Sequence, residues 1–155
     1  MNGVLLAFLG GQLARASGRV ILAESRRDLE ARPISVPVAR RYAREVLATW
    51  GLDDLVEDAL AVTSELVTNG VEATLRHRAP FAARDLWIGL CRTDARVIVQ
   101  VWDRTPEPPR PADQGREAIR GRGLPLVGSI AETWGCRWPQ GGGKIVWALL
   151  RKSRP

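Results

Sequence analysis

Two polar side chains, Glu65 and Asn69, stand four residues apart inside a long helical pattern that runs from about Asp53 to Leu75. Residues at this spacing lie one turn apart on the same face of a helix, so a carboxylate and an amide project side by side. An amide carbonyl is a neutral hard oxygen ligand for Mg²⁺, and a neighbouring carboxylate can orient or deprotonate a nucleophile. The pair indicates a metal-and-phosphate site, with solvated surface residues as the ordinary alternative.

A second chemical signal is the run Gly121-Arg122-Gly123-Leu124, where a short helix is predicted to begin and to extend to Ala131. Glycines let a backbone approach a ligand closely, and the start of a helix offers free amides to a phosphate. Arg122 can add a charge-assisted contact. A plain glycine turn before a helix is the alternative, and the segment lacks the spacing of a P-loop.

Asp103 stands where a predicted buried strand enters a long segment, Arg104 to Arg122, that is rich in proline and arginine. A carboxylate at this place can accept a hydrogen bond from an exocyclic amine such as that of adenine, although an Asp after a strand is often only a turn residue. Long connections in compact domains commonly serve as functional lids. We therefore expect this segment to cover a ligand site.

The elements that must position these residues follow a clear order of helix, helix, hairpin, lid, helix and hairpin. The first helix begins at Ser35 and ends at Gly51, and Asp53 is expected to cap the second. Alternating apolar residues predict two antiparallel hairpins, the first of them from Leu86 to Val101. Consecutive hairpins and segregated helices predict an α+β two-layer sandwich, with a mostly antiparallel mixed sheet covered on one face by helices.

The first part of the chain has no clear pattern of secondary structure. We divide the chain into residues 1–34, an N-terminal extension or edge strand, and residues 35–151, which form the main domain. Within the extension, the run from Arg19 to Ala23 is either a first strand at the sheet edge or an arm that binds a partner.

The composition is that of one ordinary globular domain, with 155 residues, 45% hydrophobic and 26% charged. The net charge is +6, but the arginines are scattered among acids, so direct nucleic-acid binding is not expected; that alternative predicts strongly salt-dependent binding to any duplex. Cys91 and Cys136 lie far apart in strand patterns, which predicts buried reduced thiols. The apolar run from Val4 to Leu9 is too short to span a bilayer, so we expect a cytoplasmic protein without membrane contact.

Taken together, these motifs resemble those of a known family, the GHKL-type ATP-binding proteins of actinobacteria, which are similar to anti-sigma-factor serine kinases and to histidine-kinase-like ATPase domains. The resemblance covers roughly residues 35 to 150, and the joint order of the motifs is more specific than any one of them. The motifs are the N box Glu65-Leu66-Val67-Thr68-Asn69, a first nucleotide box at Asp103 with Pro106 to Pro111, a second from Gly121 to Val127, and closing strands with Trp134-Gly135 and Gly143 to Ala148.

The resemblance implies a Bergerat-type fold that binds ATP with Mg²⁺ between the long helix and the lid. By position it assigns a role to each motif residue: Asn69 as the Mg²⁺ ligand, Glu65 as the polarising base, Asp103 as the adenine contact, and Gly121, Arg122, Gly123 and Leu124 as the phosphate loop.

The resemblance also implies a function in transcription regulation. Such proteins are serine/threonine kinases that transfer the γ-phosphoryl group of ATP to a serine of an anti-anti-sigma partner of the STAS type, and they hold a sigma factor inactive. Homodimer formation through an exposed tryptophan face or the first thirty residues is left open.

Two departures from the family pattern favour an alternative function, a catalytically silent binding module that sequesters a transcriptional regulator. The first box reads Asp103-Arg104-Thr105-Pro106-Glu107, without the glycines that related kinases carry there. Ile145 stands where a hydroxyl residue often helps to hold adenine through water.

Overall fold

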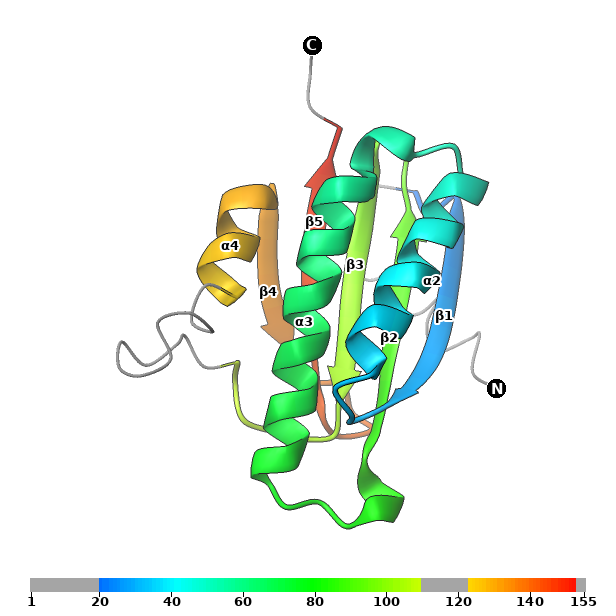
Figure 1. Cartoon of the computed structure of the whole chain (residues 1–155). Coiled ribbons are helices and arrows are strands. Elements are labelled where there is room, and N and C mark those ends of the chain that lie inside the picture. The colour runs from blue at the N-terminus through cyan, green and yellow to red at the C-terminus, as the bar shows by residue number, and fades with distance from the viewer. Residues whose placement is uncertain (1–19, 110–122, 153–155) are drawn as a thin grey trace.

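The structure, a computed structural model, describes residues 20–109 and 123–152. Its elements follow the predicted order along the chain (Figure 1). They are β1 (Ala23–Glu30), α2 (Ser35–Thr49), η1 (Asp53–Leu55), α3 (Val56–Arg76), η2 (Phe81–Ala83), β2 (Asp85–Arg92), β3 (Arg96–Asp103), α4 (Gly123–Ile130), β4 (Thr133–Arg137) and β5 (Lys144–Arg151).

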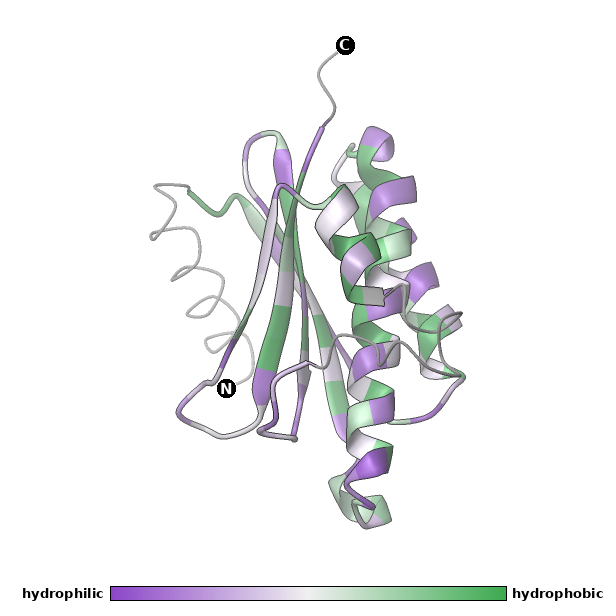
Figure 2. Ribbon diagram, turned by 90° about the vertical axis from the view of Figure 1, so that its left-hand side faces the viewer, coloured by the Kyte–Doolittle hydropathy of each residue, from purple (hydrophilic) through white to green (hydrophobic). Residues whose placement is uncertain are grey.

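The five strands form one sheet in the order β1-β2-β3-β5-β4, and every neighbouring pair is antiparallel. The helices α2, α3 and α4 all lie on the same face of this sheet, as the edge-on view shows (Figure 2). The predicted α+β sandwich, with a helical layer on one side, is therefore confirmed. α3 crosses the middle of the sheet and contacts α2, α4, β3 and β5.

The main core forms between the helical layer and the sheet. Apolar residues recur along α3 at steps of three and four, and Leu60, Leu66 and Val67 on this stripe are at most 2% exposed. The alternating residues of β2 and β3 point to the same side and meet the stripe. Gly70 lies where α3 meets the sheet, and a Cβ there would be in ordinary van der Waals contact with Val101 Cγ1 at 3.4 Å.

The opposite face of the sheet carries its own apolar clusters. Trp87 and Ile145 pack with the partly buried Trp102 and Trp147, and the guanidinium of Arg26 lies 4.9 Å from the centre of the Trp87 ring. A second cluster on this face consists of Cys91, Ile98 and Leu149, and the partly buried Trp147 packs against both clusters. Alternation along β3 and β5 thus sends every second residue away from the helices.

Two details differ from the sequence-based expectations. Asp53 begins the 3-10 turn η1 instead of capping α3, which starts at Val56 without a side-chain cap hydrogen bond. This prediction was wrong because the extra turn moves the helix start three residues along the chain. Val20, Ile21 and Leu22 precede the edge strand, which begins at Ala23. Gly51 ends α2 in the left-handed region with φ +67°, as expected.

Candidate functional site

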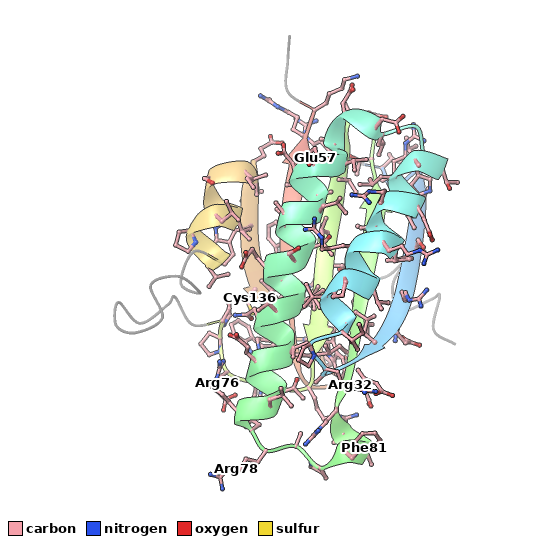
Figure 3. The ribbon with its side chains drawn as sticks, in the orientation of Figure 1. Arg32, Glu57, Arg76, Arg78, Phe81 and Cys136 are labelled. Carbon is pink, nitrogen blue, oxygen red and sulfur yellow. The ribbon has the colours of Figure 1, made fainter. Side chains whose placement is uncertain are left out.

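A cavity of about 330 Å³ opens between the C-terminal half of α3 and the segment that follows β3. Asn69, Ala73 and Arg76 line it from α3, because residues four and seven positions apart share one face of a helix. Its remaining lining comes from His77, Glu107, Pro108, Pro109 and Lys144. Arg76 projects at the end of α3, at the same end of the molecule as the loop that holds Phe81 (Figure 3).

Asn69 lines the cavity with its amide side chain on α3. Its Oδ1 atom is buried and has no hydrogen-bond partner. A buried acceptor without a partner is costly, so an atom of this kind is suited to bind a ligand that arrives later. A neutral amide oxygen is an acceptable ligand for Mg²⁺, which usually keeps several waters and takes the rest of its oxygens from phosphates.

Glu65 lies one turn before Asn69 on α3 but does not line the cavity. Burial raises the pKa of its carboxyl group, and the negative charge of Glu72 raises it further. A carboxylate with a raised pKa accepts a proton more readily near neutral pH, which suits a general base. On α2, Arg40 donates hydrogen bonds to Ser64 Oγ at 2.5 Å and to Leu60 O at 3.1 Å, and so fixes the turn beside Glu65.

Asp103 belongs to a buried polar cluster with Thr105 and Lys144. Its Oδ1 atom accepts hydrogen bonds from Thr105 N at 2.9 Å, from Thr105 Oγ1 at 2.5 Å and from Lys144 Nζ at 2.9 Å. Lys144 Nζ also donates to Thr105 Oγ1 at 2.6 Å. Asp103 and Lys144 thus form an ion pair, and each of the two side chains is 1% exposed. Asp103 Oδ2 lies 2.9 Å from Nζ as well, outside hydrogen-bond geometry, and is left without a hydrogen bond.

His77 and Glu107, which both line the cavity, contact each other. The Nε2 atom of His77, just past α3, meets Oε2 of Glu107 on the segment after β3. Although desolvation acts to raise it, the pKa of the Glu107 carboxyl group is lowered, mainly by the hydrogen bond with His77. The contact ties this segment to α3 beside the cavity.

The second glycine motif is only partly described. Gly121 and Arg122 lie outside the described residues, so their predicted role as a phosphate loop stays a prediction. Gly123 is the first residue of α4, as expected for a helix start, and Leu124 is 9% exposed. None of the described residues of α4 lines the cavity, although α4 packs against α3.

The expectation for Ile145 is wrong. Ile145 pairs with Trp102 in the ladder between β3 and β5, and its side chain packs on the far face of the sheet with Trp87. Lys144 is the residue opposite Asp103, so it occupies the place expected for a hydroxyl group. A shift of one residue along a strand moves a side chain to the other face, which explains the error.

Sequence reasoning missed Lys144, Thr105, Arg76 and His77 as parts of the site. Arg76 could have been found, since it lies seven residues after Asn69 on the same helix face. Lys144 carried a weaker signal: it is one of only two lysines beside many arginines, and it opens an apolar strand.

Cys91 is buried, and its pKa is raised to about 12, chiefly by burial. Cys136 is half-buried on β4, and burial raises its pKa too, so neither thiol is predisposed to act as a nucleophile. The described residues contain no group of three or more His, Cys, Asp or Glu side chains that could hold a metal ion. Among those residues no helix is both long and apolar enough to cross a membrane.

The sequence matches the family model of the histidine kinase-like ATPase domain over residues 29–149. No curated protein matches the chain.

Solved structures resemble the fold. One is a crystal structure of the RsbU and RsbW domains of Rv1364c from Mycobacterium tuberculosis, with a TM-score of 0.63 and 22% identity; the match covers 86% of this chain and 33% of that one. Our chain thus spans only a third of that structure. Another is the SiaB–SiaC complex from Pseudomonas aeruginosa, with a TM-score of 0.59 and 14% identity, covering 94% of this chain and 98% of that one.

At these identities the structural likeness concerns the fold alone, whereas the family match spans most of the sequence. The five-stranded antiparallel sheet with its layer of helices fits both comparisons. The chain belongs to the histidine kinase-like ATPase domain family.

Proposed function

We propose that this protein binds ATP with Mg²⁺ in the cavity beside α3 and acts as an anti-sigma-type regulator that phosphorylates a serine of a STAS-type partner. The observation that carries the proposal is the buried, unpaired Oδ1 atom of Asn69 in the wall of that cavity. Because the remaining ligands of Mg²⁺ can come from phosphates and water, the protein needs to supply only one oxygen ligand, the amide oxygen of Asn69.

Each residue has a defined task in this proposal. Asn69 holds the Mg²⁺ ion, and the cation neutralises charge on the phosphates and orients them. Glu65 receives the proton of the attacking hydroxyl, a task that its raised pKa supports. Asp103, which is paired with the cavity-lining Lys144, contacts the adenine base, and the segment from Gly121 to Leu124 binds the phosphates with its backbone amides.

Partner recognition rests on the fold likeness to the RsbW-containing structure and to the SiaB–SiaC complex. In this proposal, a sigma factor and an anti-anti-sigma protein compete for the protein, and phosphorylation of the latter decides between them. Neither a nucleic acid nor a membrane is part of the proposal, and the protein acts in the cytoplasm. A homodimer is compatible with it.

The kinase is tested by incubating the protein with radiolabelled ATP, Mg²⁺ and each STAS-domain protein of the source genome. We expect label on a serine of one of them. Glu65→Gln should lower the transfer rate about 100-fold or more, the usual worth of a general base, while ATP affinity changes little. Glu57→Gln, in the exposed first turn of the same helix, is the matched control and should transfer at the parental rate.

The second candidate is a binding module without turnover. It is favoured by the segment from Asp103 to Glu107, which has no glycine, and by the position of Glu65 outside the lining of the cavity. This candidate predicts that ATP binds while no STAS-domain protein acquires label. Transfer at the parental rate by Glu65→Gln would remove Glu65 from the mechanism.

A further inference from the structure

We propose that residues 1–19 of this chain cover the tryptophan face, which is the side of the sheet that points away from the helices and carries Trp87, Trp102 and Trp147. The face is then closed within one molecule and does not join two copies of the chain. This inference goes beyond the proposed function and does not depend on nucleotide binding.

The tryptophan face is apolar and buried. Cys91 and Ile145 are 0% exposed there, and Ile98 is 3% exposed. Among residues 20–109 and 123–152, however, the helices α2, α3 and α4 all lie on the other side of the sheet (Figure 2). An antiparallel sheet with one face open to water carries polar residues on that face, whereas this face carries tryptophan and aliphatic side chains. The tryptophan face therefore needs a cover from outside the described residues.

Two polar side chains on this face lack a partner. Gln100 is 0% exposed; its Nε2 atom donates to Cys91 Sγ at 3.4 Å, but its Oε1 atom has no hydrogen-bond partner among the described residues. Glu24 lies opposite Cys91 in the ladder between β1 and β2, and within the same part of the chain its buried Oε2 atom has no partner either. Burial also raises the pKa of the Glu24 carboxyl group. Since buried acceptors are nearly always hydrogen-bonded, both oxygens indicate donors that come from elsewhere.

The described chain begins at the edge of this face. Ile21 packs against the cluster that contains Cys91, and Leu22 N donates to Arg92 O at 2.9 Å, which extends the ladder between β1 and β2. Residues 1–19 therefore join the chain beside the face. Even at about 1.5 Å per residue, the rise of a helix, nineteen residues reach about 28 Å, whereas five strands spaced about 4.8 Å apart span about 19 Å. The segment is long enough to cross the sheet.

The composition of residues 1–19 matches the face. Six consecutive apolar residues run from Val4 to Leu9. The segment also contains two arginines and no acidic residue, so it offers donors to the unpartnered oxygens of Glu24 and Gln100. Because the segment is joined to β1, its effective concentration at the face is in the millimolar range, which favours it over a second copy in dilute solution.

The thiol of Cys91 reports on the cover, since it lies on this face and the chain has only two cysteines. In the full-length Cys136→Ser variant, a maleimide can label Cys91 alone. We expect the native variant to react at least about 100-fold more slowly than in urea, because a covered thiol reacts only when the structure opens. The rate should stay constant on about hundredfold dilution, since a cover from the same chain does not depend on concentration.

The double substitution Leu5→Asp with Leu9→Asp, made in the same full-length background, places two charges in the apolar run. It should raise the labelling rate of Cys91 at least about tenfold, because burying these charges against an apolar face is costly. The matched control is Asn2→Asp with Ser17→Asp, which adds the same two charges outside the run and should react at the parental rate.

Labelling that accelerates on dilution, with a change from dimer to monomer in analytical ultracentrifugation, would overturn the proposal in favour of a second copy. Equal rates for the native protein and the urea-unfolded chain would show an open face and would overturn it as well, and so would a parental rate in the Leu5→Asp, Leu9→Asp variant. None of these measurements uses ATP, so a failure of nucleotide binding would overturn the proposed function and leave this inference standing.

Discussion

At the scale of single residues, Glu65 shows how burial changes the protonation of a carboxyl group. Desolvation raises the pKa of its carboxyl group, and repulsion from Glu72 adds to this. A raised pKa in the folded state means that the protonated form is the better tolerated one. The stability that Glu65 contributes is thus fully present below its unfolded-state pKa and is lost as pH rises through its higher folded-state pKa.

This leads to a pH-dependent prediction for Glu65→Gln, which replaces the carboxylate by a neutral group of the same shape. At pH 7 the variant should have a higher free energy of unfolding than the wild type, and below about pH 4 the difference should disappear. Urea denaturation at a series of pH values measures it. The control Glu57→Gln should show no such gain, and equal stability of Glu65→Gln and the wild type at every pH would contradict the account.

The residue scale also shows what could be predicted. The placement of Glu65 and Asn69 one turn apart on α3 was predictable, because helix periodicity alone sets it. Lys144 was not found, since its role depends on the register between β3 and β5, two strands far apart in the sequence. A register error of one residue led to Ile145, whose side chain lies on the other face.

At the scale of elements, the turn before β5 fixes the register between β3 and β5. Gly143 has φ +74°, and a Cβ atom there would lie 2.6 Å from Trp102 Nε1 and would overlap Asp103 O. Trp102 Nε1 also donates to Gly142 O at 3.0 Å, so the turn packs against the end of β3. The start of β5 therefore depends on a residue without a side chain at this position.

Gly143→Ala should lower the free energy of unfolding by at least about 3 kcal/mol, because overlap adds to the cost of the left-handed conformation. Gly51→Ala is the matched control: its φ is +67°, but no heavy atom lies within 4 Å of the added Cβ. It should cost only about 1–2 kcal/mol. Urea unfolding gives both values, and equal losses would show that close packing at Gly143 is unimportant.

Some elements could be predicted from the sequence more clearly than others. The hairpin of β2 and β3 was predictable because apolar residues recur at every second position of both strands and face the helices, although the positions between them are also mostly buried. One of the two alternatives for the first part of the chain placed β1 several residues too early. The residues just before Ala23 are apolar and resemble a strand, whereas the true strand is largely polar. An edge strand with one free side has a weaker apolar signal. The division into residues 1–34 and 35–151 stays a prediction.

At the scale of the whole molecule, the fold brings residues from distant parts of the sequence to one end of α3. Asn69 and Arg76 come from the helix, Glu107 from the segment after β3, and Lys144 from the start of β5. This convergence follows from the strand order, in which β3 and β5 are neighbours beneath α3. The sheet order, more than any single motif, creates the site.

The central claim is that Asn69 holds Mg²⁺ for a nucleotide in this cavity, and calorimetric titration with ATP tests it most directly. With Mg²⁺, the wild-type protein should bind ATP with micromolar affinity, and a chelator should weaken binding at least about tenfold. Asn69→Ala should lose the Mg²⁺-dependent part, while Asn69→Asp, which keeps an oxygen ligand, should retain it. No binding at millimolar ATP, or unchanged Mg²⁺-dependent affinity in Asn69→Ala, would contradict the claim.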